Sequence, residues 1–241
     1  MSFTHSIMFH HFHSAKHLPA QGSLNADDFN EMLDWLSKRH NLIGANEYLT
    51  KFNEGILSPS DICLSFDDAL LCQYDIALPV LSERKLDAFF FVYSSVFSGN
   101  PDNLEIFRFF RTNSFTSIDE FYSQFFEAVL SIYNQEFAEH ESKYAGLNYL
   151  DAFPFYTASD KWFRYLRDQM LGPDKYEALM FELMKVKDFD PLAATKILWM
   201  SESQLKEIAS RGHLIGLHSY SHPTKMSALS YSEQLKEYQR N

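Results

Sequence analysis

The sequence predicts an α/β protein built around a parallel sheet. Three short, mostly apolar runs, Ser6–Phe9, Asp61–Phe66 and Ala88–Val92, have the length of strands, and longer amphipathic segments separate them. Strands that are apolar without alternation are typical of parallel sheets, because helices cover both faces of such sheets. The strand–helix–strand order belongs to the same class. Polar residues follow two of the predicted strands directly, which predicts a site at the strand ends.

The N-terminal part contains the three predicted strands and two predicted helices. The first strand leads into a His-His-Phe-His sequence at residues 10–13. Residues 27–40 carry apolar side chains at helical spacing, and Asn25 is expected to cap that helix at its N-terminus. Residues 70–84 form the second predicted helix, in which Pro79 is expected to cause a kink or a break.

Residues 97–200 show a different pattern, with mostly helical spacing. A helix is predicted over residues 159–171, and other helices are predicted to begin where a capping residue is followed three positions later by a residue that completes a capping box. The predicted starts are Ser117 with Glu120, Asp174 with Glu177, and Ser201 with Gln204 just after the segment. This stretch is therefore predicted to be a helical insertion.

The strand pattern returns after the helical segment. Gly212 is expected to end the preceding helix, because glycine is the usual C-terminal cap. Residues 213–217 then form a short predicted strand that ends at His218, and a helix is predicted from residue 230 onward. His222 lies four positions after His218, so both imidazoles are expected on one side of a single turn or tight loop.

The composition argues against several classes of function. The formal net charge is −11, and a chain this acidic is not expected to bind nucleic acid or anionic lipid non-specifically. The longest apolar runs are far too short to span a bilayer. Residues 1–16 lack a basic segment followed by an apolar one, so no signal peptide is predicted. The two cysteines, Cys63 and Cys72, are expected to be reduced, and the protein is predicted to be cytoplasmic.

Two acidic residues and two histidines follow different predicted strands. Asp67 and Asp68 end one strand, and His218 and His222 follow the last one. The carboxyl ends of parallel strands meet at one edge of the fold, so the two clusters are expected to lie together. Two imidazoles and one carboxylate suit a divalent metal, zinc above all, with cobalt, nickel or manganese as alternatives. The predicted metal ligands are therefore Asp68, His218 and His222.

The remaining acid, Asp67, is the predicted catalytic base. It lies next to a predicted ligand and can accept a proton from a water molecule that a metal has activated. Each cluster alone has a more ordinary explanation, since paired aspartates commonly cap a helix and histidines four positions apart occur by accident in loops. Their joint occurrence at two strand ends favours the site.

These residues resemble two motifs of the polysaccharide deacetylases, the NodB-homology family of carbohydrate esterases. Residues 64–69, Leu-Ser-Phe-Asp-Asp-Ala, resemble the Thr-Phe-Asp-Asp-Gly motif, and residues 218–223, His-Ser-Tyr-Ser-His-Pro, match the His-[Ser/Thr]-x-x-His-Pro motif. Residues 212–217 and 8–11 resemble the segments Gly-His-Glu-Ile-[Gly/Ala]-x and Met-Tyr-His of the same family. The resemblance covers roughly residues 5–97 and 200–235.

The resemblance implies a distorted (β/α) barrel and a hydrolytic activity. Residues 1–241 would form one polysaccharide-deacetylase-like domain, with residues 97–200 as a large helical insertion. By resemblance, the general base is Asp67, the metal ligands are the three residues already predicted, and Ser219 supports the loop between the histidines. The implied reaction is metal-dependent hydrolysis of the acetamide of an N-acetylated sugar or glycan precursor.

The sequence departs from the family pattern after His222. The Arg-x-Pro-x-Gly-type segment and the late Leu-x-His that carries the general acid are not found, so the barrel is expected to be incomplete and the chain to be a fragment or a truncated member. The alternative candidates for the proton donor are the histidines after the first predicted strand, His10, His11 and His13. Two other functions stay open: hydrolysis of C–N bonds in small amides or ureides, and a non-catalytic module that binds metal or glycan. The sequence indicates neither the residues that bind substrate nor the oligomeric state.

Overall fold

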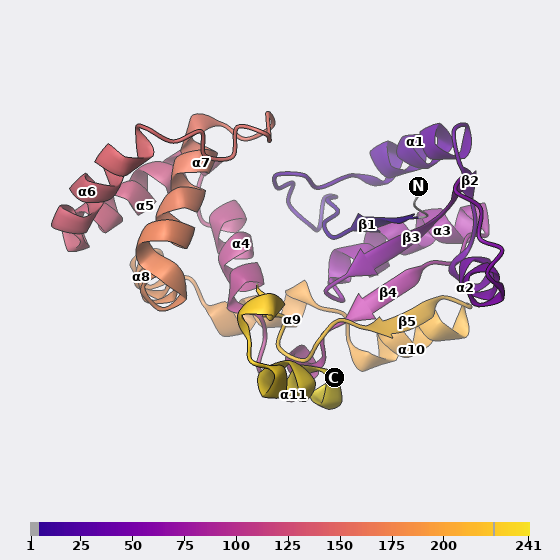
Figure 1. Ribbon diagram of the computed structural model, residues 1–241. Coiled ribbons are helices and arrows are strands. Elements are labelled where there is room, and N and C mark those ends of the chain that lie inside the picture. The colour runs from indigo at the N-terminus through magenta and orange to yellow at the C-terminus, as the bar shows by residue number, and fades with distance from the viewer. Residues whose placement is uncertain (1–4, 224) are drawn as a thin grey trace. The chain divides into compact units, whose positions relative to one another are not determined.

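The computed structural model describes residues 5–223 and 225–241, and they form two compact units. The sheet unit consists of the chain up to Asp102 together with Ala193–Asn241, and the helical unit is Asn103–Leu192 (Figure 1). The helical unit lies inside the predicted insertion of residues 97–200. A single domain over the whole chain stays a prediction.

The sheet unit contains a parallel sheet whose strands end at a common edge. β1 (His5–Phe9), β3 (Asp61–Asp67), β4 (Phe89–Val92) and β5 (Leu214–Leu217) lie in the order β1-β3-β4-β5, and the short β2 (Asn41–Leu42) pairs with the beginning of β3. All of these pairings are parallel, and the arrowheads of the four longer strands point toward the same edge in Figure 1. The predicted α/β class is confirmed, and an incomplete barrel is compatible with this open sheet.

Helices connect the strands of the sheet unit. Their bounds are α1 (Ala26–Ser37), α2 (Ala45–Glu54), η1 (Gln73–Ala77), α3 (Leu78–Arg84), η2 (Ser94–Ser98), α10 (Glu202–Ser210), η4 (Met226–Ala228) and α11 (Tyr231–Arg240), while α9 (Pro191–Leu198) spans the boundary between the units. Asn25 caps α1 by accepting a hydrogen bond from Asp28 N, and Ser201 with Gln204 forms the predicted capping box of α10. Both predicted helix starts are confirmed.

Two features of the sheet unit differ from the prediction. Helix α2 and strand β2 were not predicted, because Tyr48 and Leu49 lie in a short segment with little apolar periodicity. Pro79 lies in the first turn of α3, directly after the π-helical turn η1. The predicted helix over residues 70–84 is therefore divided into the wider π-helical turn η1 and the α-helix α3. Pro79 is tolerated in the first turn of α3, where its missing N–H group would have no partner within the helix.

The interior of the sheet unit is aromatic. Phe9 from β1 and Phe66 from β3 stack with ring centroids 5.7 Å apart, and Phe66 stacks on Phe90 of β4 at 4.8 Å. Phe12 and Phe29 pack edge to face against each other at 5.1 Å. All five side chains are buried, so β1, β3 and β4 are held together by stacked rings as well as by backbone hydrogen bonds.

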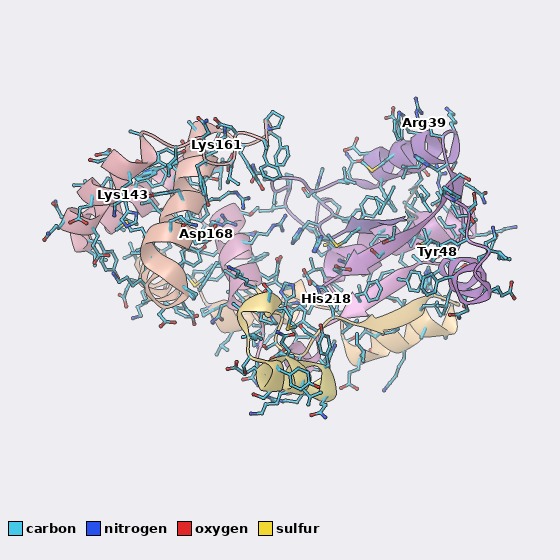
Figure 2. All side chains as sticks on the ribbon, viewed as in Figure 1. Arg39, Tyr48, Lys143, Lys161, Asp168 and His218 are labelled. Atoms are coloured by element: carbon cyan, nitrogen blue, oxygen red, sulfur yellow. The ribbon has the colours of Figure 1, made fainter. Side chains whose placement is uncertain are left out.

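The helical unit contains α4 (Asn103–Asn113), α5 (Ile118–Ile132), α6 (Asn134–Tyr144), α7 (Ala158–Tyr165), η3 (Leu166–Leu171) and α8 (Gly172–Val186). Its core is again aromatic, with Phe110, Phe121, Phe125 and Phe163 almost fully buried. The charged side chains labelled on this unit in Figure 2 lie outside that core, where Lys161 pairs with Asp151 at 2.6 Å. Such exposed pairs contribute little to stability.

In the helical unit, the predicted helix start at Ser117 is confirmed without its capping box, and two other predicted starts are displaced. Ser117 caps α5, but the Glu120 carboxylate accepts hydrogen bonds from Thr116 and not from Ser117, so the capping box does not close. Helix α7 begins at Ala158, one residue before the predicted start at residue 159, and is capped by Thr157 with Asp160 completing the box. Helix α8 begins at Gly172 and not at Asp174, because Pro173 suits the first turn of a helix.

Candidate metal centre and catalytic site

The two aspartates lie at the end of the central strand β3. Asp67 is the last residue of the strand, and the backbone N–H of Asp68 donates to the carbonyl of Phe91 on β4 at 3.0 Å. The chain then turns sharply, with φ of 76° at Asp68 and 53° at Ala69. Left-handed backbone is costly for residues other than glycine, and such strain is typical of functional sites. Ala69 occupies the position where the family motif has glycine.

The two histidines lie on a tight loop after β5. The backbone N–H of His218 donates to Val92 O at 2.9 Å, which extends the β4–β5 ladder up to the loop. Ser219 and His222 both have positive φ, 64° and 54°. The side chain of Ser219 is buried, which is compatible with its predicted support of the loop.

Residues outside the motif hold this loop in place. The carboxylate of Glu237 on α11 accepts hydrogen bonds from the backbone N–H groups of Tyr220 and Ser221 at 3.0 and 2.7 Å. On the other side, Ser95 N donates to Tyr220 O at 3.0 Å. The loop is thus fixed to both α11 and η2.

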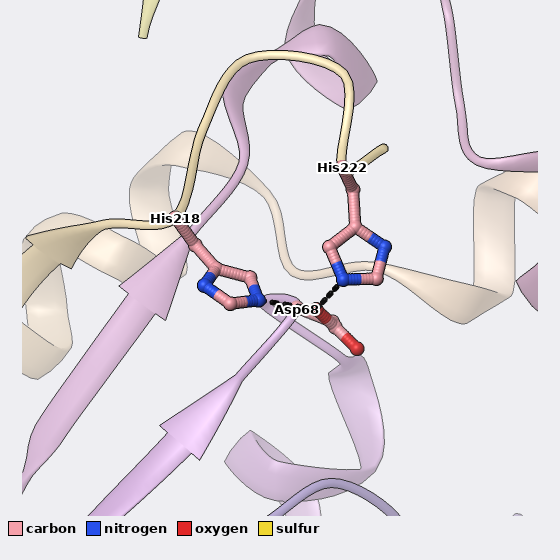
Figure 3. A group of neighbouring side chains, drawn as sticks. All are labelled: Asp68, His218 and His222. Atoms are coloured by element: carbon pink, nitrogen blue, oxygen red, sulfur yellow. Dashed lines mark ion pairs between the residues drawn. The ribbon is translucent and has the colours of Figure 1, made fainter. Parts of the chain in front are cut away.

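The structure brings Asp68, His218 and His222 together (Figure 3). Asp68 Oδ1 lies 3.4 Å from His222 Nε2 and 3.6 Å from His218 Nε2, and one ligand atom from each residue lies within 4.8 Å of the others. Two imidazole nitrogens and one carboxylate oxygen form a donor set that zinc and similar ions take, and three protein ligands leave a position for water. The three residues therefore fit a divalent cation, and their role as ligands stays a prediction.

The predicted base lies beside this group. Asp67 Oδ2 is 3.7 Å from His218 Nε2, and the side chain is buried. Among the described residues, Asp67 Oδ1 has no hydrogen-bond partner. Burial raises the pKa of Asp67 to about 6, although the nearby His222 acts in the opposite direction. A carboxylate in such an environment holds a proton more readily than one in water does.

The two histidines differ in their electrostatic surroundings. Burial, and then the neighbouring His222, lower the pKa of His218, which favours the neutral ring that a metal requires. Burial also opposes charge on His222, but its hydrogen bond to Asp102 and the nearby carboxylates of Asp68, Asp102 and Asp67 together raise the pKa of His222.

The histidines after β1 reach the same edge. His10 Nε2 lies 3.6 Å from Asp68 Oδ2, and the His11 ring stacks on the His10 ring with centroids 5.8 Å apart. Gln73, which is fully buried, donates through Nε2 to the backbone carbonyls of His10 and Asp67 at 2.9 and 2.6 Å. Gln73 therefore ties the end of β1 to the end of β3.

Sequence reasoning missed four residues of this site. Asp102 accepts from His222 Nδ1 at 3.1 Å, the buried Tyr93 ring stacks on His222 with centroids 5.1 Å apart, and Gln73 and Glu237 fix the two loops. Only Tyr93 carried a signal, because it follows strand β4 directly at the same sheet edge. The other three lie on helices and loops whose positions depend on the fold.

The C-terminal part of the chain matches a known family. Residues 175–241 match the family model described as polysaccharide deacetylase. Over residues 175–241, the resemblance to the polysaccharide deacetylases is confirmed. This match contains His218 and His222, whereas the two aspartates lie outside it and join the histidines only in the folded chain.

Solved structures of deacetylases are similar to this chain or to part of it. A Streptococcus pyogenes deacetylase, PplD, solved in complex with acetate, is 13% identical with a TM-score of 0.45, and the match covers 97% of this chain and 63% of that one. IcaB from Ammonifex degensii is 25% identical over 37% of each chain, with a TM-score of 0.29. A de-N-acetylase from Aggregatibacter actinomycetemcomitans is 21% identical over 41% of this chain and 40% of that one, with a TM-score of 0.32. The chain thus spans less than two thirds of the length of each of these proteins.

No curated protein matches the sequence. The search for membrane spans, made over the described residues, found no helix with the length and apolarity needed to cross a bilayer.

Proposed function

We propose that the chain is a metal-dependent deacetylase that hydrolyses the acetamide of an N-acetylated sugar or glycan precursor. The observation that carries this proposal is the meeting of Asp67, Asp68, His218 and His222 at one edge of the parallel sheet. The family match of residues 175–241 supports the same reaction class. The cytoplasmic location expected from the sequence stays a prediction.

Asp68, His218 and His222 would hold the divalent cation. Zinc suits this donor set best, and cobalt, nickel or manganese are the alternatives. A cation bound there supplies polarisation of the acetyl carbonyl and a lower pKa of a water molecule. Asp67 and Tyr93 are buried beside that position, whereas the side chains of His218 and His222 are 32% and 27% exposed.

Asp67 acts as the general base. Its carboxylate accepts a proton from the attacking water, whose oxygen forms a bond to the acetyl carbon. The C–N bond then breaks, acetate forms, and the sugar nitrogen leaves as an amine after it takes up a proton. His10 is the candidate donor of that proton, because its Nε2 already lies 3.6 Å from Asp68 Oδ2. His11 stacks behind it and is the second candidate.

The proposal is tested by metal analysis combined with acetate release from N-acetylglucosamine and its oligomers. The wild type is expected to retain about one zinc per chain and to release acetate, and Asp68→Ala is expected to lose both. The matched control is Asp174→Ala, which changes an exposed aspartate at the start of α8. A wild type without bound metal, and no change on Asp68→Ala, would refute the proposal.

The same assay separates the alternatives. A panel of small amides and ureides is measured beside the acetylated sugars, and turnover of the amides alone would favour a non-sugar hydrolase. Tight metal binding without any turnover would favour a non-catalytic binding module. His10→Ala and His11→Ala, compared at equal metal content, identify the proton donor by which of them lowers kcat.

A further inference from the structure

The ring nitrogen of His222 that faces away from Asp68 contacts a second carboxylate, that of Asp102. The Nε2 of His222 points toward Asp68 Oδ1 at 3.4 Å, and its Nδ1 lies 3.1 Å from Asp102 Oδ2. The two carboxylates therefore contact opposite nitrogens of one ring. Asp102 approaches only the nitrogen that does not face Asp68 and His218.

We propose that Asp102 is a positioning residue that fixes the tautomer and the rotation of His222. An ionised carboxylate accepts a hydrogen bond and cannot donate one. The Asp102 oxygen lies at hydrogen-bond distance from Nδ1, 3.1 Å, whereas the Asp68 oxygen lies farther from Nε2, at 3.4 Å, so Asp102 favours the tautomer with a proton on Nδ1. That tautomer carries its lone pair on Nε2, the nitrogen that faces Asp68. The expected effect on metal affinity rests on the proposed metal site, since a histidine whose tautomer is fixed binds a metal more tightly.

The surroundings of Asp102 suit this role. Asp102 follows β4 by way of the short helix η2, whose Ser95 N–H binds the carbonyl of Tyr220 inside the histidine loop. The segment that carries Asp102 is thus tied to the loop that carries His222. Tyr93, at the other end of this segment, stacks on the His222 ring with an interplanar angle of 20°. One face of the ring and its outer nitrogen are therefore both fixed by residues 93–102.

Asp102 is not a member of the ligand group itself. The group formed by one ligand atom per residue contains Asp68, His218 and His222, and Asp102 lies behind His222. Its effect must therefore pass through the imidazole. Asp102→Ala should leave all three ligands in place but remove the partner that orients one of them.

The first measurement is the tautomer of His222 in the metal-free protein, by NMR of ¹⁵N-labelled histidine at an alkaline pH where the ring is neutral. The wild type is expected to show the tautomer protonated on Nδ1, and Asp102→Ala a mixture of the two. Asp102→Asn, which keeps an acceptor oxygen without the charge, is expected to lie between them. An unchanged tautomer in Asp102→Ala would overturn the inference, and this readout holds even if the wild type fails to bind metal.

The second measurement is zinc affinity, by competition with a chelating dye. Asp102→Ala is expected to weaken zinc binding by about 10- to 100-fold, and Asp174→Ala to leave it unchanged. Thermal unfolding in excess chelator checks that Asp102→Ala is folded. Zinc affinity equal to that of the wild type in a folded Asp102→Ala would overturn the inference while leaving the proposed function intact, whereas failure of the wild type itself to bind zinc would refute the proposed function.

Discussion

Two buried aspartates, one in each unit of the molecule, differ in how fully the fold provides hydrogen bonds to their carboxylates. Asp160 in the helical unit is 4% exposed and accepts hydrogen bonds from the Tyr122 hydroxyl and from the backbone N–H and hydroxyl of Thr157. Asp67 in the sheet unit is 5% exposed, and one of its oxygens lacks a hydrogen-bond partner among the described residues. The two carboxylates are almost equally buried, but the fold provides more hydrogen bonds to Asp160 than to Asp67.

The difference separates a structural carboxylate from one poised for chemistry. A buried charge that its own fold satisfies stabilises that fold, as Asp160 does at the N-terminus of α7. A buried carboxylate that the fold leaves partly unsatisfied costs stability, and such groups are concentrated at functional sites. Replacement of Asp67 is therefore expected to lower kcat, whereas replacement of Asp160 is expected to lower the free energy of unfolding.

Replacement of the base is expected to have the largest effect. Asp67→Asn keeps the shape of the side chain but cannot accept a proton, so kcat should fall by about 10²- to 10⁴-fold. Metal content should stay close to that of the wild type, and the free energy of unfolding should not decrease, because the substitution removes a buried charge that the fold leaves partly unsatisfied. The wild-type rate should also fall as the pH drops through about 6 or below, because the raised pKa of Asp67 leaves more of it protonated there. Equal kcat values for both proteins would show that Asp67 is not the base.

Replacement of the structural acid should change stability and not chemistry. Asp160→Ala removes the carboxylate half of the α7 capping box, although Thr157 still caps the helix, and leaves the Tyr122 hydroxyl buried without its acceptor. This should cost about 2 to 3 kcal/mol of unfolding free energy. Urea unfolding followed by circular dichroism measures the loss, with Asp174→Ala as the exposed control. A cost below about 0.5 kcal/mol, typical of surface substitutions, would contradict the comparison.

A third buried acid, Asp61, is expected to make the stability of the protein depend on pH. Asp61 accepts hydrogen bonds from Asn41 Nδ2 at 2.6 Å and Ser58 N at 2.9 Å, and these bonds lower its pKa against the effect of burial, with a smaller contribution from Lys51. A lowered folded-state pKa gives stability that is present above the unfolded value of about 3.9 and is lost as the pH falls through the folded value. The urea midpoint should therefore decrease below about pH 4, and Asp61→Asn should flatten that decrease. An identical pH profile for the variant would assign the decrease to other acids.

The smallest expected effect concerns backbone strain outside the site. Lys85 is exposed and ends α3 with φ of 54°, whereas Gly55 ends α2 with φ of 70°. Glycine adopts this conformation without steric cost, so Lys85→Gly should stabilise the protein by about 0.5 to 1 kcal/mol, and Gly55→Ala should destabilise it by a similar amount. Thermal unfolding of both variants tests the prediction, and destabilisation by Lys85→Gly would contradict it.

Local rules predicted most of the strands and the capped helices of the sheet unit. The strands were recognisable as short, mostly apolar runs, and in Asp61–Asp67 every residue is buried. The other strands are less enclosed, since Met8 of β1 is 57% exposed and Leu217 of β5 is 66% exposed. The helix caps at Asn25 and Ser201 were recognisable because a cap needs only residues three positions apart. The starts of α7 and α8 were misplaced, because Thr157 and Gly172-Pro173 competed with equally plausible signals nearby.

The four candidate catalytic and ligand residues were predictable for a similar reason. Each follows a strand, and parallel strands bring their carboxyl ends together whatever separates them in sequence. Asp102, Gln73 and Glu237 were not predictable, because each acts from a helix or a loop across a contact between segments distant in sequence. The sequence around a carboxylate in a loop does not indicate which distant imidazole it will contact.

The sequence by itself determined the α/β class and the two motifs whose residues could bind a cation. Periodicity, short-range capping and the motif letters are local properties, and they need no knowledge of the fold. Only the tertiary structure decided that Asp68, His218 and His222 have ligand atoms within 4.8 Å of one another, that His10 joins them, and that Asp102 lies behind His222. Those distances depend on sheet order and on packed loops, because residues 150 positions apart meet only when β3, β4 and β5 pair in that order.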